Sequence, residues 1–354
     1  MQPQETISSW IGRSVDGGRN GVSALVPKQI MQLLNDRSHS RDFDYDYNDT
    51  DVTLLAQWGG ISRQVVEDSI RAALPLGLLP PSQRLQFCHC CVAEDLKRSR
   101  MPIWRHAWSS IYIPMCVEHE EVLSSLAGDY ECHDIFDRGA QASRHIINNM
   151  YYLHDFAGDR PEWLCSQPTT FSGVMGEIDC LLKDTCLIIQ RDIEGRVATG
   201  CDEGNKLRLV VNLYTAILRR HRRGIDPTPY CLVIAGKIKR ILYLPEQARS
   251  DSINDILDGF TDRLDPYVRM VALAIIAVLL GYQNCEKNWS EIARLFRSTG
   301  VLMPDTASGL YGLVTGGEET GIRNWITKQV TASAKNELIS RIESFTGNLY
   351  RNAR

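Results

Sequence analysis

Three cysteines and one histidine have the types and the spacing of metal ligands. Two residues separate Cys88 from Cys91, and two residues separate Cys116 from His119. Each pair fits on one tight turn, and two such turns can supply a zinc ion with three sulfur ligands and one nitrogen ligand. The sequence therefore predicts a zinc site at these four residues. Buried cysteines with a purely structural role are the alternative interpretation.

A catalytic role for this zinc is not expected. A catalytic zinc keeps one coordination position open, whereas four protein ligands close the site. Zinc deaminases carry H-x-E followed by P-C-x-x-C. His119 and Glu121 form H-x-E, but the C-x2-C pair precedes them and no second C-x2-C pair follows. We therefore expect no enzymatic activity and a zinc that contributes folding free energy. Cys90, between the first two ligands, should point away from the metal.

The segment after the first cysteine pair alternates basic and aromatic side chains. It contains Arg98 and Arg100, followed by Trp104, Arg105 and Trp108. This pattern suits contact with phosphates and stacking on bases. In the alternative interpretation the tryptophans pack a small core and the cations are only solvated. Both interpretations stay open, and we expect the two tryptophans to be mainly structural.

These residues resemble the signature of the TniQ/TnsD family over roughly residues 3–125. Besides the four ligands, the matching residues near the metal are Glu94, Asp95, Trp104, Arg105 and Trp108. The matching residues near the N-terminus are Glu5, Ser9, Trp10 and Arg13. His89 and Val117 stand where the family has proline. Many members carry a second cysteine cluster, of which this chain has only Cys132 and His133.

The resemblance implies target selection in transposition. Proteins of this family are not transposases. They recognise a site on double-stranded DNA or join an RNA-guided CRISPR surveillance complex, and they recruit an AAA+ ATPase that brings the transposase. Homodimer formation is a further option. The alternative function is that of a free-standing transcription regulator with a zinc site and a helix-turn-helix.

The segment between the two matching stretches predicts a helix-turn-helix. Leu54, Leu55 and Trp58 have helical spacing, and Gly59–Gly60 should end the helix. A second helix should start at Ser62, and its apolar face should contain Val65, Val66 and Ile70. An ordinary helical hairpin is the alternative.

In a helix-turn-helix the start of the second helix enters the major groove. Ser62, Arg63 and Gln64 would then contact DNA, with Arg63 able to reach guanine and Gln64 adenine. The preceding acidic segment, residues 41–51, lacks the glycine and the glutamate of a calcium loop. We expect this segment to be an acidic surface loop, with a partner contact as an option.

The second half of the chain predicts helices. An amphipathic helix should bury Leu209, Leu213, Ile217 and Leu218, and it ends in a cluster of arginines: Arg219, Arg220, Arg222 and Arg223. This cluster suits phosphate contact, although cations also compensate a helix dipole. We expect residues 270–282 to form a buried core helix, too short to span a membrane. Residues 288–301 should form a core helix with no second helix after it. Four cysteines without ligand spacing should be buried thiols: Cys165, Cys180, Cys186 and Cys201.

The bulk properties fit a mainly helical protein. The 354 residues carry a net charge of -4, which argues against non-specific coating of nucleic acid. We expect a helix-turn-helix domain over residues 1–85, a zinc ribbon over 86–135 and a helical domain over 136–354. The first residues do not resemble an export signal. We therefore expect a cytoplasmic protein that does not enter a membrane, in which clustered cysteines indicate metal or reactive thiols rather than disulfides.

Overall fold

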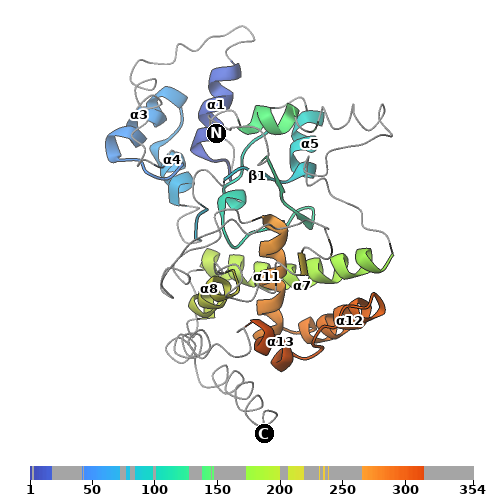
Figure 1. Ribbon diagram of the computed structural model, residues 1–354. Helices are drawn as coiled ribbons and strands as arrows, with labels where there is room; N and C mark the ends of the chain where they lie inside the picture. The colour runs from blue at the N-terminus through green and yellow to red at the C-terminus, as the bar shows by residue number, and fades with distance from the viewer. Residues whose placement is uncertain are drawn as a thin grey trace, which may run out of the picture. The chain divides into compact units, whose positions relative to one another are not determined.

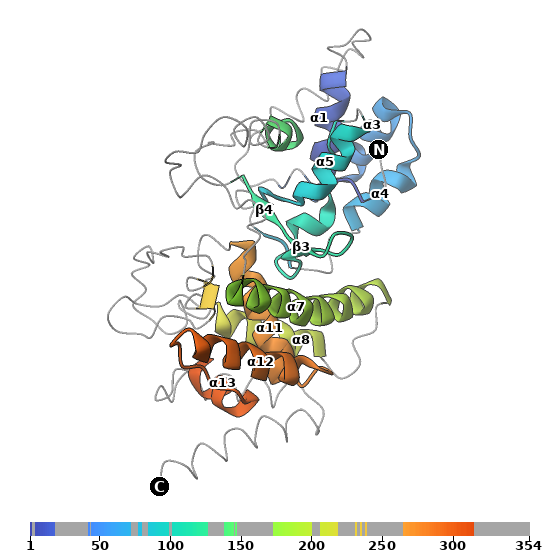
Figure 2. The same ribbon diagram turned by 90° about the vertical axis from the view of Figure 1, so that its right-hand side faces the viewer.

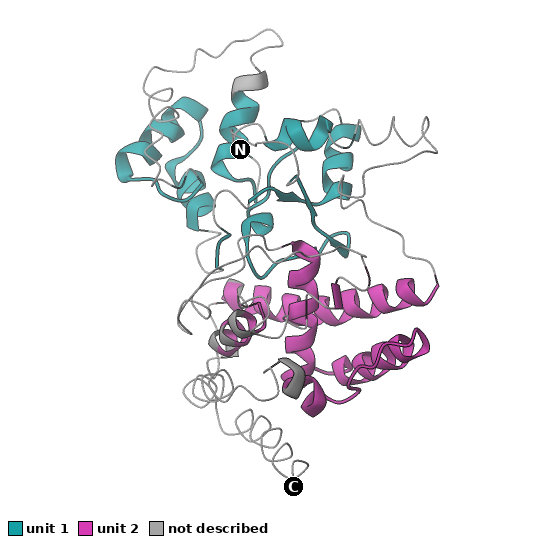
Figure 3. Cartoon of the chain, in the orientation of Figure 1, with its two compact units in different colours: residues 1–168 teal, residues 169–354 magenta. Residues whose placement is uncertain are grey.

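The chain forms two compact units, Met1–Pro168 and Thr169–Arg354 (Figure 3). The computed structural model describes residues 1, 4–17, 42, 44–71, 77–79, 84–98, 101–126, 138–144, 146, 173–199, 206–218, 231, 234–235, 238 and 265–314. Most of these residues lie in helices, so the predicted mainly helical fold class is confirmed. The finer division of the chain at residues 85 and 135 stays a prediction.

Three helices of the first unit share one apolar cluster (Figure 1). They are α1 (Ile7–Gly17), α3 (Asp49–Gly59) and α4 (Arg63–Arg71). Asn48 begins α3 with a reciprocal capping box, in which Asn48 and Asp51 each accept a hydrogen bond from the other's backbone N–H. Gly60 ends α3 at a φ of 59°, a left-handed conformation that favours glycine. The predicted break at Gly59–Gly60 is therefore confirmed.

The second helix of this hairpin differs from the prediction at one position. Its start is as predicted, because the Val65 N–H lies 3.4 Å from the Ser62 hydroxyl. Val66 is fully buried, but the Val65 side chain is 43% exposed. Adjacent residues of a helix point about 100° apart, so a narrow contact face takes only one of them. The prediction of an inward Val65 was wrong.

A second cluster of the first unit surrounds the predicted metal ligands. Its elements are short: β1 (Gln86–Phe87) pairs antiparallel with β4 (Ser124–Ser125), and β2 (Met115–Cys116) pairs antiparallel with β3 (Glu121–Val122). Helix α5 (His89–Lys97; Figure 2), the 3₁₀ turn η3 (His106–Ser109) and the buried residues Ala142 and Ile146 also belong to it. Trp104 and Trp108 are each 1% exposed and pack edge to face. The prediction that they are structural is confirmed.

The acidic segment is tied into the first unit rather than lying wholly on its surface. Asp44 is 2% exposed and accepts hydrogen bonds from the Ser8 amide and, at 3.0 Å, from Arg138. Asp42 pairs with Arg84 at 2.6 Å. Burial alone would raise the pKa of the Asp44 carboxyl, but Arg138 and the hydrogen bonds from Ser8 hold that pKa below its ordinary value. The expected acidic surface loop was therefore wrong for Asp44.

A helix buried on every side organises the second unit. All residues of α11 (Pro266–Leu279) are buried, and the Asp265 side chain caps its first turn. The helices in contact with α11 are α7 (Val174–Thr199), α8 (Lys206–Ile217), α12 (Cys285–Ser298) and α13 (Ala307–Val314) (Figure 1). The predicted core helix is thus confirmed. Among the described residues, no helix is long and apolar enough to cross a membrane.

Helix α12 is the predicted core helix, with Trp289, Ile292 and Phe296 buried. The expectation that no second helix follows was wrong, because α13 does. Its sequence, ASGLYGLV, contains two glycines and a serine, which are weak helix formers. The packing of α13 on α11 and the burial of Leu310 and Tyr311 compensate for this weak propensity.

The remaining predictions concern the amphipathic helix, the single cysteines and the arginine cluster. The predicted inward residues of the amphipathic helix are all buried: Leu209, Leu213, Ile217 and Leu218. Cys186 is buried as predicted, whereas Cys180 is exposed, which contradicts the prediction. Cys165, Cys201 and the arginine cluster lie outside the described residues.

Candidate metal centre

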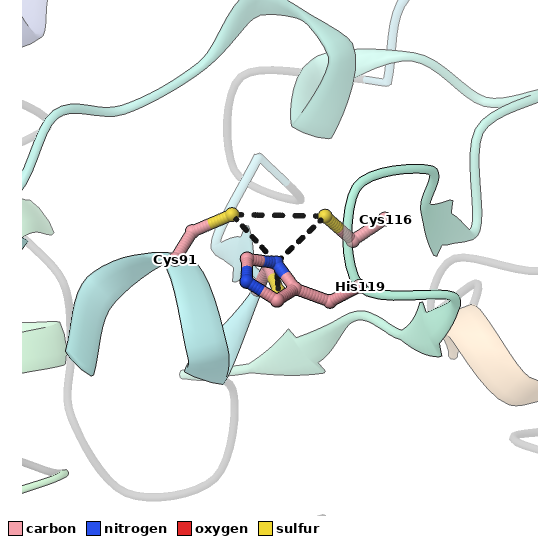
Figure 4. A group of neighbouring side chains, drawn as sticks. Cys91, Cys116 and His119 are labelled. Carbon is pink, nitrogen blue, oxygen red and sulfur yellow. Dashed lines mark hydrogen bonds between the residues drawn. The ribbon is translucent and has the colours of Figure 1, made fainter. Parts of the chain in front are cut away.

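Two local structures bring the predicted ligands together. Cys88 lies at the N-cap of α5 and Cys91 in its first turn, so one helix start supplies two sulfurs. Cys116 lies in β2, and the turn between β2 and β3 carries His119. All four side chains converge on one point from these two elements, and Figure 4 labels three of them. Cys90 is not part of the group, as predicted.

The distances between these side chains fit a tetrahedral ion. The Nδ1 atom of His119 lies 3.6, 3.3 and 3.5 Å from the Sγ atoms of Cys88, Cys91 and Cys116, respectively. The Sγ atoms of Cys91 and Cys116 are 3.6 Å apart. Zinc bonds of about 2.3 Å to sulfur and about 2.05 Å to nitrogen imply edges of ~3.8 Å between sulfurs and ~3.6 Å from sulfur to nitrogen. The four residues could therefore hold a metal ion, and their spacing is compatible with zinc.

Backbone amides of both turns donate to the sulfurs. The Cys91 N–H donates to Cys88 Sγ, and the His119 N–H donates to Cys116 Sγ. Hydrogen bonds of this kind lower the pKa of a thiol because they stabilise its charged form. The same turn that sets the spacing of each ligand pair thus also stabilises a thiolate.

The pKa values of the three thiols in the cluster shift in different directions. Hydrogen bonding with Cys116 raises the pKa of the Cys88 thiol to about 12 and also raises the pKa of Cys91. Hydrogen bonds from Cys88 and Cys91 lower the pKa of Cys116. Metal ligands must be deprotonated, so an ion entering this site would displace protons from Cys88 and Cys91.

A carboxylate lies on the far side of the His119 ring. The Nε2 atom of His119 is 2.9 Å from Glu94 Oε1, and Glu94 also lies 3.6 Å from Arg98. The Glu94 carboxylate raises the pKa of the His119 imidazole. The sequence pattern showed Glu94 only as part of the family resemblance and gave it no role. The local signal for such a role is that Glu94 follows the ligand Cys91 by three residues in α5, which places both on one face of the helix.

The structure describes four of the predicted nucleic-acid residues: Ser62, Arg63, Gln64 and Arg98. Arg63 pairs with Asp49 and Glu67, and Gln64 donates to Asp68 at 2.7 Å. Ser62 caps the same helix, and Arg98 is the C-cap residue of α5 and lies near Glu94. Arg100, Arg219, Arg220, Arg222 and Arg223 lie outside the described residues. Each described candidate with a charged or amide group is thus held by a carboxylate.

Comparison of the chain with protein-family models, with curated proteins and with solved structures finds no match.

Proposed function

We propose that this protein is a non-enzymatic adaptor for target selection in transposition, of the TniQ/TnsD kind, held in shape by a structural zinc. The observation that carries the proposal is a contact between the two stretches that resemble the family. The Trp104 N–H donates to Ser9 Oγ at 2.8 Å, and the Thr6 N–H donates to the Trp104 carbonyl at 2.8 Å. Glu5 in turn binds Ser9 and Arg13. Residues that are separate in the sequence pattern thus form one network.

Zinc is the metal that the donor set favours. Three thiolates and one imidazole suit the tetrahedral N/S coordination of zinc, whereas magnesium and calcium prefer oxygen. Four protein ligands would leave no open position, which favours a structural role over a catalytic one. In this role the metal would join α5 to the β2–β3 hairpin and complete a zinc ribbon.

A transposition assay tests both the adaptor function and the absence of catalysis. We expect that omitting this protein from a system containing its neighbouring AAA+ ATPase and transposase abolishes targeted insertion. The Glu121→Gln variant should restore insertion fully, because the H-x-E pattern matters only in an enzyme. Insertion that is unaffected by omission would contradict the adaptor function. A large loss in Glu121→Gln at normal zinc content would favour an enzyme instead.

We propose that the α3–α4 hairpin, the predicted helix-turn-helix, docks on a target-bound protein complex rather than directly on DNA. Over residues 46–71 the exposed or half-exposed carboxylates outnumber the two arginines, Arg63 and Arg71; the carboxylates are Asp46, Asp49, Glu67 and Asp68. Carboxylates beside Arg63 repel phosphates and already bind this arginine, which would otherwise read a base. These charges favour the RNA-guided mode over direct recognition, and over the alternative of a transcription regulator.

Titration of purified protein on duplex DNA at two salt concentrations separates these modes. We expect weak binding without sequence preference. The dissociation constant of Arg63→Ala should be within about twofold of the wild-type value, because Arg63 is already paired with carboxylates. Arg71→Ala is the matched control, since Arg71 lies on the same helix and also pairs with Glu67. Arg219→Ala/Arg220→Ala should weaken any residual binding for all sequences alike and flatten its salt dependence. A sequence preference that Arg63→Ala relaxes would support direct recognition.

A further inference from the structure

We infer that Glu94 is the positioning residue of the metal centre, which makes Nδ1 of His119 the atom that faces the ion. The inference rests on the proposed zinc. It starts from the two sides of one imidazole ring: Nδ1 lies 3.3–3.6 Å from three cysteine sulfurs, and Nε2 lies 2.9 Å from Glu94 Oε1. Each ring nitrogen therefore has its own kind of partner.

The tautomer of the ring follows from these partners. A neutral imidazole carries its proton on one nitrogen and a lone pair on the other, and only the lone pair can bind a metal. A carboxylate accepts a proton but cannot donate one when ionised. Glu94 therefore holds the proton on Nε2, leaves the lone pair on Nδ1 and increases the basicity of that ligand atom.

Helix α5 places Glu94 where this interaction is possible. Residues three apart lie on the same face of a helix, so Cys91 and Glu94 both point toward the β2–β3 turn. One helix face thus supplies a metal ligand and the carboxylate that orients a ligand of the opposite element. Arg98, four residues further along the chain, lies 3.6 Å from the other oxygen of Glu94.

The partial exposure of the pair sets the expected size of the effect. The His119 side chain is 19% exposed and the Glu94 side chain 44% exposed. Water can replace part of a lost hydrogen bond at such a position. We therefore expect Glu94 to tune metal affinity rather than to decide whether the unit folds.

The test is zinc affinity, measured by competition with a chromogenic chelator at fixed pH. Removing the carboxylate in Glu94→Ala is expected to weaken zinc binding about 10–100-fold, the usual range for partners of a metal-bound histidine. Glu94→Gln should lose less, because the amide oxygen still accepts the Nε2–H. Glu291→Gln is the matched control, since Glu291 is 43% exposed and also pairs with an arginine of its own helix. It should bind zinc as the wild type does.

Different experimental results would overturn the inference about Glu94 and the zinc site itself. Wild-type protein without zinc would overturn the metal site and the inference with it. If the wild type holds zinc and the zinc affinity of Glu94→Ala is within about twofold of the wild-type value, only the inference about Glu94 is overturned. A second readout is the ¹⁵N spectrum of the zinc-loaded wild type. Metal on Nδ1 and a proton on Nε2 of His119 are expected, and metal on Nε2 would also overturn the inference.

Discussion

The Cys116→Ser variant is expected to lose its zinc and the structure around it. A neutral serine hydroxyl is a poor zinc ligand, and structural zinc contributes about 10–16 kcal/mol of apparent binding free energy in zinc-finger peptides. Cys116 also belongs to the buried cluster around Phe87, Trp104 and Trp108. Loss of the metal should therefore expose apolar side chains and not only free a turn.

Elemental analysis and limited proteolysis measure the two consequences. Wild-type protein should contain about one zinc per chain, as one four-ligand site requires. Cys116→Ser should contain almost none and should be cleaved within residues 84–98 and 101–126, where the wild type is expected to resist cleavage. Cys90→Ser is the control, because Cys90 lies on the same helix as Cys91 but outside the ligand group. Near-full zinc retention by Cys116→Ser would refute the assigned ligands.

The Asp44→Asn variant is expected to destabilise the first unit strongly while retaining zinc. Asp44 and Arg138 are 2% and 1% exposed, so the substitution leaves a buried guanidinium without its counter-charge. Breaking a buried ion pair in this way typically costs about 3–5 kcal/mol. Arg138 also lies over the Trp104 ring, so its displacement would reach the core beside the metal centre.

The matched control is the same substitution at an exposed pair. Asp49 is 82% exposed and pairs with Arg63, and exposed ion pairs contribute little to stability. Asp49→Asn should therefore leave the urea midpoint of the first unit unchanged. The midpoint is measured from the hydrogen exchange of peptides from this unit at increasing urea concentration. Equal changes in the urea midpoint for the two substitutions would show that burial of the Asp44–Arg138 pair does not determine its contribution to stability.

The pH dependence of the Asp44 effect has a defined sign. The folded-state pKa of Asp44 is lowered from its ordinary value of 3.8. A carboxyl with a lowered pKa contributes stability that is fully present above its unfolded pKa and is lost as the pH falls through its folded pKa. The difference in unfolding free energy between wild type and Asp44→Asn should thus be constant near neutral pH. It should shrink below about pH 4. A difference that grows in acid would contradict the assigned pairing.

Local patterns determined much of this protein from its sequence. The spacing within each ligand pair is set by one turn, so Cys88 with Cys91 and Cys116 with His119 could be recognised without a fold. The Gly59–Gly60 break follows from the backbone freedom of glycine. Helix α11 was predictable as buried because its residues 270–279 are apolar on every face.

Tertiary structure alone decided the features that depend on distant segments. Asp44 looked like a surface aspartate because Arg138, 94 residues away, gives no local signal. Cys180 and Cys186 lie on different faces of one long helix, and only the packing of α7 buries the second. The contact between Glu94 and His119 likewise joins a helix to a hairpin turn 25 residues later. The periodicity of the backbone determines which residues share a turn or a face, but which faces meet depends on how the whole chain buries its apolar surface.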